Sequence, residues 1–198
     1  LMALIISFVG SRKLAEPQFK EHARLFFNLC YRCAELGIVG RSGGALGADL
    51  IFEQAYQQAI LDNKTTANHA EIFVPWQRFR AIKDTPNPLE RFHIIPSDPA
   101  LIERAENMVR ETHPAPNKLS QGAMKLHARN MNQVFGLDLN TPIDASICWT
   151  ENGVKSGGTA SNITLCEKNN IPVFNLGGDP QKVLLDIKGF FQDKNIIR

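Results

Sequence analysis

This sequence of 198 residues has little net charge, few cysteines and no long apolar run. Its 22 basic and 20 acidic residues give a formal net charge of +2, which argues against a dedicated polyanion-binding protein. Its four cysteines are too few and too scattered to form a disulfide framework. The apolar run over residues 3–9 is too short to span a membrane, so we expect a cytoplasmic protein with no membrane partner.

The composition is that of a folded globular protein. With 43% hydrophobic and 21% charged residues, the chain is more apolar than disordered chains are. Its length fits one large domain, which we expect over residues 1–198. Cys30 and Cys33 form a C-x-x-C motif inside a helical pattern, whereas a redox pair usually follows a strand directly. We therefore interpret both as buried apolar side chains, and we predict no metal site.

Strand-like and helix-like segments alternate along most of the chain. Continuous apolar or β-branched runs predict strands, and apolar residues at helical spacing predict helices between them. The alternation predicts an α/β, Rossmann-like fold, in which a parallel sheet carries helices on both faces. The predicted strands lie near 3–9, 38–41, 70–75, 144–149 and 171–176, and the predicted helices near 17–36, 49–61, 98–112, 120–135, 159–169 and 180–192.

The stretch 80–118 interrupts this alternation. Prolines punctuate it, and residues 80–97 show no clear hydrophobic period. We interpret the stretch as an insertion in the single domain. Two roles are open for it, a lid over a site or a contact within an oligomer.

Glycine-rich turns follow three of the predicted strands. They are Gly10-Ser11-Arg12, the segment 41–49 and the segment 155–159. The carboxyl ends of parallel strands share one edge of the sheet, where ligands bind. Glycine lets the backbone approach a ligand closely, and the N-terminus of the helix that follows favours an anion. Together the turns predict a site for a small phosphorylated ligand.

None of the three turns has the sequence of a common nucleotide-binding motif. The Gly-Lys-Ser or Gly-Lys-Thr sequence that ends a P-loop motif is absent, and so is the G-x-G-x-x-G motif. We therefore exclude an ordinary NTPase and an ordinary dinucleotide-dependent oxidoreductase, and we expect no cofactor.

Several side chains next to these turns are candidate ligand contacts, each with a structural alternative. Arg12 and Arg41 can hold a phosphate in a bidentate contact or form ordinary ion pairs. Asp49 can contact a ribose hydroxyl or a metal, although we favour a role as the cap of its own turn. Trp76 and Phe79 can stack on a base or pack in the core.

Three more residues carry weaker indications. Lys155 can add positive charge beside the third turn. Glu151 is the carboxylate nearest to that turn in the sequence. His127 lies on a predicted helix, where a surface or packing role explains it better than a ligand contact.

The order of these motifs resembles that of the SLOG superfamily. The most specific part is Ser-Gly-Gly-Ala-Leu-Gly-Ala-Asp at 42–49. The other parts are Gly10-Ser11-Arg12, Val74-Pro75-Trp76, Arg129-Asn130-Met131 and Ser156-Gly157-Gly158-Thr159. That group contains the DNA-processing protein A (DprA) family, the LOG phosphoribohydrolases and small YspA/YpsA-like proteins, some of them phage-encoded. The resemblance implies a Rossmann-like domain that binds a nucleotide or a nucleotide-derived ligand, as a homodimer or a larger homo-oligomer. It also implies that Arg129 and Asn130 lie at the pocket.

One position departs from the pattern of the LOG enzymes. Their P-G-G-x-G-T-x-x-E motif ends in a catalytic glutamate, and Thr164 stands at that position here. A threonine cannot act as the carboxylate acid or base that glycosidic cleavage needs. We therefore expect a protein that binds an ADP-ribose-like ligand without cleaving it, as a sensor or a sequestering protein.

Three alternatives stay open beside this interpretation. They are a LOG-like phosphoribohydrolase in which Glu151 replaces the missing carboxylate, a DprA-like single-stranded DNA binder, and an interaction protein with a vestigial pocket. The predicted ligand-binding residues are Gly10, Ser11, Arg12, Arg41, Ser42, Gly43, Gly44, Ala45, Asp49, Trp76, Arg129, Asn130, Lys155, Ser156, Gly157, Gly158 and Thr159.

Overall fold

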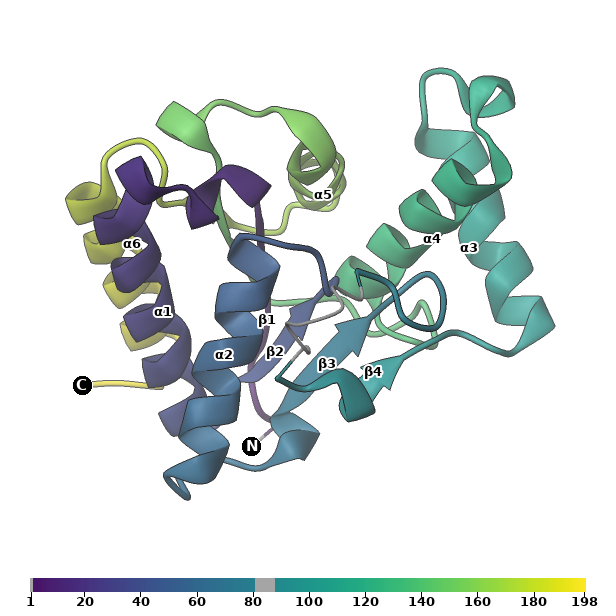
Figure 1. Ribbon diagram of the computed structural model, residues 1–198. Coiled ribbons are helices and arrows are strands. Elements are labelled where there is room, and N and C mark those ends of the chain that lie inside the picture. Colours follow the sequence, from purple (N-terminus) through teal and green to yellow (C-terminus); the bar gives the residue numbers. More distant parts are fainter. Residues whose placement is uncertain (1, 81–87) are drawn as a thin grey trace.

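The structure, a computed structural model, describes residues 2–80 and 88–198. Its strands form one sheet in the order β4-β3-β2-β1-β5-β6, and every neighbouring pair is parallel (Figure 1). The predicted α/β, Rossmann-like fold is confirmed. The strands are β1 (Ile5–Gly10), β2 (Val39–Ser42), β3 (Ala70–Phe73), β4 (His93–Ile94), β5 (Ala145–Trp149) and β6 (Val173–Asn175).

Helices cover both faces of the sheet (Figure 1). One face carries α1, α2 and α6 over a core that includes Phe8 and Phe52. The second core, which includes Val109, Val134 and Leu165, joins α3, α4 and α5, and α3 packs on α4 away from the sheet (Figure 1). Among the described helices, none is both long enough and apolar enough to cross a lipid bilayer. The helices are α1 (Lys20–Glu35), α2 (Ala48–Leu61), α3 (Pro99–Thr112), α4 (Gln121–Phe135), α5 (Gly157–Lys168) and α6 (Pro180–Asp193).

The strand β1 lies at the centre of the sheet because its side chains suit burial on both faces. Ile6 and Phe8 on one face and Ser7 on the other are fully buried, and the ring of Phe8 stacks on Phe52 of α2 with 5.2 Å between centroids. Gly40 in β2 makes room for this helix, since a Cβ there would lie 2.4 Å from Cε2 of Phe52. The ring pair therefore holds α2 against the sheet.

The order of the strands creates a crevice beside β1. After β1 the chain builds β2, β3 and β4 on one side, and it then forms β5 and β6 on the other. The register of β1 and β5 runs from Ile6 opposite Ala145 to Gly10 opposite Trp149. In open parallel sheets, ligands bind outside the carboxyl ends of the strands where the order reverses. The loops after Gly10 and Trp149 border that position.

The stretch 80–118, predicted as an insertion, contributes one strand to the sheet. Its residues 81–87 lie outside the described residues. Residues 93–94 form β4, which is parallel to β3. A strand of this length is too short to show a hydrophobic period, so the sequence pattern did not predict it. The helix α3 follows as predicted, with the carboxylate of Asp98 accepting a hydrogen bond from the N–H of Ala100 at 2.9 Å.

The cysteines lie in the protein interior. All four are buried free thiols. Burial raises the pKa of Cys30 and of Cys33 in α1, so both stay protonated at neutral pH. The interpretation of this C-x-x-C pair as buried side chains is confirmed.

Candidate functional site

A cavity of about 520 Å³ opens at the carboxyl edge of the sheet, next to the ends of β1 and β5. The loop after β1, the start of α2, one face of α4 and the loop from β5 into α5 enclose it. Its volume is typical of small-molecule sites. It is lined by Val9, Gly10, Ser11, Arg12, Lys13, Ala45, Asp49, Phe79, Leu126, His127, Arg129, Asn130, Gln133, Glu151, Ser156, Gly157, Gly158, Thr159 and Asn162.

The structure brings most of the predicted ligand residues together in this cavity. Those that line it are Gly10, Ser11, Arg12, Ala45, Asp49, Arg129, Asn130, Ser156, Gly157, Gly158 and Thr159. Those that do not line it are Arg41, Ser42, Gly43, Gly44, Trp76 and Lys155. The first and third glycine-rich turns therefore supply more of the lining than the second.

Gly10 allows three elements to meet at the cavity. A Cβ at this position would lie 2.6 Å from the carbonyl oxygen of Trp149 in β5 and 2.7 Å from Cβ of Ala48 in α2. Any larger residue would push these elements apart. The glycine is therefore required by packing at the crevice as well as by the turn.

Two basic residues follow β1 at the mouth of the cavity. Ser11 caps a short 3-10 helix by accepting a hydrogen bond from the N–H of Lys13 at 3.2 Å. The ammonium of Lys13 forms a 2.5 Å ion pair with Glu151, and this hydrogen bond raises the pKa of Lys13. Arg12 is exposed and makes no hydrogen bond or ion pair with the described residues, so its guanidinium is available to an anion.

Asp49 holds the glycine loop that borders the cavity. One of its carboxylate oxygens accepts hydrogen bonds from the N–H of Gly43 at 3.2 Å and of Ala45 at 3.1 Å. Burial raises the pKa of Asp49, and the positive charge of Arg129 opposes this effect. Asp49 thus caps its own turn, the role that the sequence favoured, and the loop does not offer these two N–H groups to a ligand.

Arg129 places a buried positive charge in the wall of the cavity. Its guanidinium donates to the main-chain carbonyl of Gly43 and, through Nε, to Oδ1 of Asn130 at 3.2 Å. It also lies over the ring of Phe79, 5.4 Å from the centroid. Burial lowers the pKa of Arg129 to about 10, which leaves it charged at neutral pH. Among the described residues no carboxylate lies within ion-pair distance of it, although the more distant charge of Asp49 raises its pKa.

The N-terminus of α5 opens into the same cavity without a side-chain cap. Ser156 occupies the cap position and makes no capping hydrogen bond. A Cβ at Gly157 or Gly158 would meet nothing within 4 Å, so there is open space above the first turn. The first N–H groups of a helix have no partner within the helix, and they favour an anion. This turn therefore has a geometry that suits an anion.

Two of the predicted ligand residues in β2 make structural contacts instead. The guanidinium of Arg41 forms a 2.5 Å ion pair with Glu71 and donates to the carbonyl of Thr141 at 2.6 Å. The hydroxyl of Ser42 donates to the carbonyl of Phe8 at 2.8 Å. Both side chains are buried and bind neighbouring elements to β2.

Trp76 and Lys155 also lie outside the cavity lining. The indole of Trp76 packs edge-on against Phe79, with 5.4 Å between centroids, and it is Phe79 that lines the cavity. The ammonium of Lys155 pairs with Glu167 at 2.7 Å on the surface of α5. The sequence placed these residues next to the right turns but could not show which side chain enters the cavity.

Sequence reasoning did not select Gln133 and Asn162, two buried side chains of the cavity wall. Gln133 follows Arg129 by four residues on α4, and Asn162 follows Thr159 by three on α5. Residues three or four apart share one face of a helix. Helical spacing from the residues already predicted was thus the signal that could have found both.

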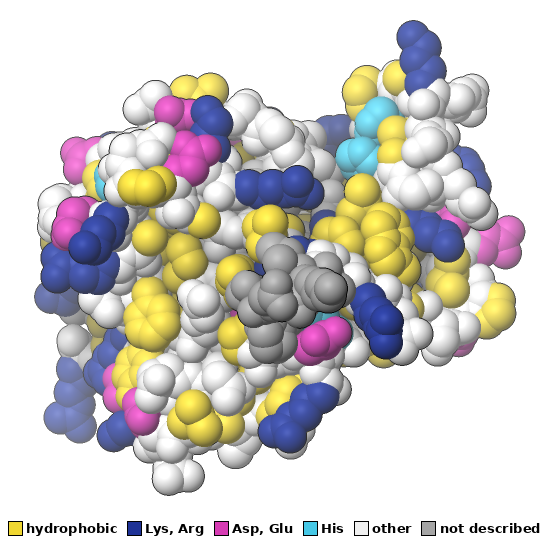
Figure 2. Space-filling view, in the orientation of Figure 1, with side chains coloured by type: hydrophobic (Ala, Val, Ile, Leu, Met, Phe, Trp, Pro, Cys, Tyr) yellow, Lys and Arg dark blue, Asp and Glu magenta, His cyan; other side chains and the backbone are white. Residues whose placement is uncertain are grey.

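His127 lines the cavity, although the sequence favoured a surface or packing role for it. Its ring meets that of His113 edge to face, with 4.8 Å between centroids. Burial lowers the pKa of His127, and the charges of His113 and Arg129 act in the same direction. His127 is therefore neutral at neutral pH. Histidine side chains gather on the α3–α4 part of the surface in Figure 2.

A buried polar cluster supports the glycine loop. Glu53 of α2 forms an ion pair with Arg80 at 3.3 Å, and its Oε1 lies within hydrogen-bond distance of Nε2 of His93 in β4, at 3.1 Å. Arg80 also donates to the carbonyl of Ala45. The cluster ties β4 to the loop beside the cavity. Within the described part of the chain, no three His, Cys, Asp or Glu side chains are placed to hold a metal ion.

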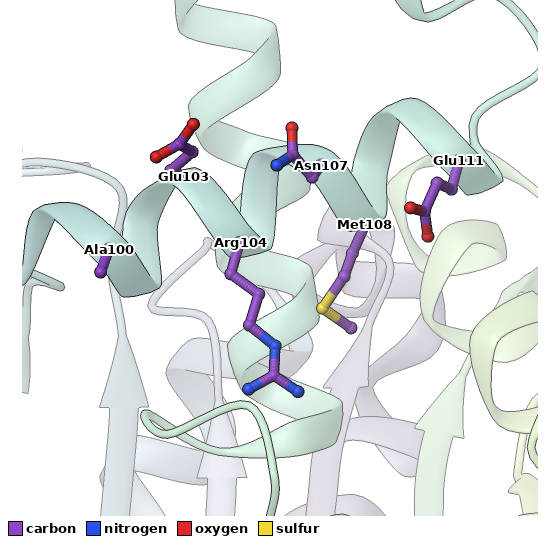
Figure 3. Close-up of a pocket in the computed structure, with 6 residues that line it drawn as sticks. All are labelled: Ala100, Glu103, Arg104, Asn107, Met108 and Glu111. Carbon is purple, nitrogen blue, oxygen red and sulfur yellow. The ribbon is translucent and has the colours of Figure 1, made fainter.

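A second cavity, of about 450 Å³, lies along α3 (Figure 3). All of its lining residues belong to this one helix. Figure 3 shows Arg104 and Met108 extending to one side of the helix and Glu103 and Asn107 to the other. A single helix surface does not enclose a ligand, so we assign no site to it.

Comparison with known proteins supports the fold. No protein-family model matches this sequence, and no curated protein matches it significantly. A solved structure that it resembles is DNA processing protein A from Helicobacter pylori, which was described for a unique single-stranded DNA binding mode. The two are 21% identical, with a TM-score of 0.52, over 87% of this chain and 64% of that one. The chain thus shares the Rossmann-like fold of a DprA protein and spans less than two thirds of it.

Proposed function

We propose that this chain binds the phosphate of a nucleotide, in single-stranded DNA or as a free nucleotide, in the cavity beside β1 and β5. One observation carries the proposal: a buried cation and an uncapped helix N-terminus line the same cavity. Among the described residues no carboxylate lies within ion-pair distance of Arg129, and the first turn of α5 has no side-chain cap. Both features favour an anion.

The remaining lining suits the other parts of a nucleotide. Arg12 is exposed and lines the same cavity as the first turn of α5, so its guanidinium is a second candidate contact for the phosphate. Phe79, Leu126 and His127 add apolar and aromatic surface, on which a base can stack. The cavity therefore offers both a polar and a less polar wall to one ligand.

Of the two candidate ligands that carry such a phosphate, single-stranded DNA has more support. The similar DprA structure was described for binding single-stranded DNA. The net charge of +2 favours the second candidate, a free nucleotide or an ADP-ribose-like compound held by a sensor or sequestering protein. Binding of a nucleic acid draws much of its affinity from basic residues, whereas a single phosphate can be held by a few backbone N–H groups. In Figure 2 the basic side chains lie scattered over the visible face.

Cleavage of an N-glycosidic bond has less support than binding alone. Thr164 occupies the position of the LOG glutamate and does not line the cavity. The carboxylate of Asp49 is engaged by backbone N–H groups, and that of Glu151 pairs with Lys13. Neither carboxyl group is therefore placed as a free acid or base.

Two titrations test the proposal. Fluorescence anisotropy measures binding of a labelled oligothymidylate at increasing salt, and calorimetry measures binding of AMP and of ADP-ribose. We expect saturable binding in at least one assay, and a steep loss of affinity with salt if the oligonucleotide is the ligand. The absence of binding in both assays would overturn the proposal. Chromatography of AMP after incubation with the protein then shows whether the ligand is cleaved.

A further inference from the structure

Asn162 is a buried amide in the wall of the cavity with one satisfied end and one unsatisfied end. The side chain is buried, and Oδ1 accepts hydrogen bonds from the hydroxyl of Ser146 at 3.0 Å and from the thiol of Cys166 at 3.8 Å. Its Nδ2 has no hydrogen-bond partner among the described residues. A buried N–H group without a partner is rare in folded proteins, because its desolvation is not compensated.

A chain of hydroxyl groups joins this amide to the centre of the sheet. The hydroxyl of Ser7 in β1 donates to that of Ser146 in β5 at 2.8 Å, and Ser146 donates onward to Asn162. Oδ1 of Asn162 is thereby engaged inside the protein, and Nδ2 is left as the free group.

The position of Asn162 on α5 directs the side chain toward the open end of the helix. Asn162 follows Gly158 by four residues and Thr159 by three, so all three share one face, and all three line the cavity. Side chains in an α-helix lean toward its N-terminus. The free donor thus belongs to the same end of the helix as the open N–H groups of the first turn.

We propose that Asn162 is a ligand-binding residue of this anion site, in which Nδ2 donates a hydrogen bond to a phosphate oxygen seated over the first turn of α5. This inference rests on the proposed function and adds a selectivity to it. Backbone N–H groups, Arg12, Arg129 and Nδ2 of Asn162 are all donors, so this end of the cavity accepts an acceptor-rich anion and rejects a cation or an amino group.

The substitution Asn162→Asp tests the inference with little change in shape. It keeps an oxygen that accepts from Ser146 and replaces the donor by a second carboxylate oxygen. We expect the affinity for oligothymidylate or AMP, whichever binds the wild type, to fall more than tenfold at neutral pH. With oligothymidylate the loss should shrink at acid pH, because the introduced carboxyl group becomes a donor once protonated, whereas phosphodiesters do not titrate in this range.

A matched control separates binding from folding. Asn132→Asp changes an equally buried asparagine, whose Nδ2 donates to the carbonyl of Gly136 outside the cavity lining. We expect this variant to lose stability and to keep wild-type affinity in its folded fraction. An Asn162→Asp variant with affinity within twofold of the wild type would overturn the inference and leave the proposed function standing. Failure of the wild type to bind either probe would overturn both.

A measurement on the wild type covers the case in which Asn162→Asp does not fold. The side-chain amide of Asn162 is observed by NMR in protein labelled at asparagine nitrogen. We expect its protons to shift and to exchange more slowly with water when oligothymidylate or AMP is added, as those of a newly bonded donor do. Unchanged signals at saturation would overturn the inference.

Discussion

Arg129 donates a hydrogen bond from its guanidinium to the main-chain carbonyl of Gly43, and this contact joins α4 to the glycine loop. Position 43 has to be glycine for this, because a Cβ there would lie 2.4 Å from Nη1 of Arg129 and 1.8 Å from Nε2 of Gln133. The loop carbonyl compensates part of the buried positive charge. The carboxylate of Asp49, which lies beyond ion-pair distance, acts on the same charge.

We expect Arg129→Met to weaken binding of oligothymidylate or AMP at least tenfold, about 1.4 kcal/mol, because it removes the buried charge. The protein should also lose about 1–3 kcal/mol of stability, since the Gly43 carbonyl loses a donor. Anisotropy or calorimetry measures the first effect, and denaturant unfolding measures the second. Arg104→Met on α3 is the control, and equal losses of affinity in both variants would argue against this cavity as the site.

Gly158→Ala should separate binding from stability. Gly158 is the second residue of α5, its φ is not positive, and an added Cβ would meet nothing within 4 Å. We expect stability to rise by about 0.4–1 kcal/mol, because alanine restricts the unfolded chain, while affinity falls as the methyl group enters the anion space. Gly122→Ala is a matched control at the second residue of α4, also in open space but outside the cavity. If both variants bind like the wild type, the phosphate does not sit over this turn.

Arg41→Met tests a residue that the sequence placed in the ligand site. Arg41 is buried against Glu71, and it does not line the cavity. We expect a loss of stability of about 1–3 kcal/mol, below the range for fully buried pairs because Glu71 is partly exposed, and no change in ligand affinity. Thermal unfolding measures the loss of stability, and the anisotropy assay measures the ligand affinity. A loss of affinity larger than twofold in the folded variant would show that Arg41 acts on the ligand.

His127 should make stability depend on pH near neutrality. Its pKa in the folded protein is lowered from 6.5 by burial, so the unfolded chain binds a proton more readily. Above pH 6.5 the neutral His127 costs the folded protein no stability. Stability is lost as the pH falls from 6.5 toward the lowered pKa, because the unfolded chain takes up the proton first. We expect the wild type to lose more thermal stability over this window than His127→Gln does. Equal losses of thermal stability in the wild type and in His127→Gln over this window would contradict the prediction.

The strand and helix order was predictable because it depends on short-range patterns. The apolar run before Gly10 and the N-cap at Asp98 are local signals, and both lie where the pattern indicated. The strand β4 was missed because two residues carry no period. The start of α5 was placed two residues late, since glycines are counted against a helix although its first turn tolerates them.

The membership of the site was less predictable, because a side chain next to a strand end can point to either face. Arg12 follows the end of β1 and Arg41 lies near the end of β2, yet Arg12 borders the cavity and Arg41 pairs with Glu71. Trp76 and Phe79 are three residues apart, and only Phe79 lines the cavity.

The sequence by itself determined that glycine-rich turns would meet at one edge of a parallel sheet, because strand direction and turn chemistry are encoded locally. Only the tertiary structure decided which donors share the cavity. Ser7, Ser146 and Asn162 are separated by up to 155 positions in the chain, and their hydrogen bonds exist only because β1, β5 and α5 pack together. The unpartnered Nδ2 of Asn162 therefore results from the packing of distant segments, and no local sequence pattern could predict it.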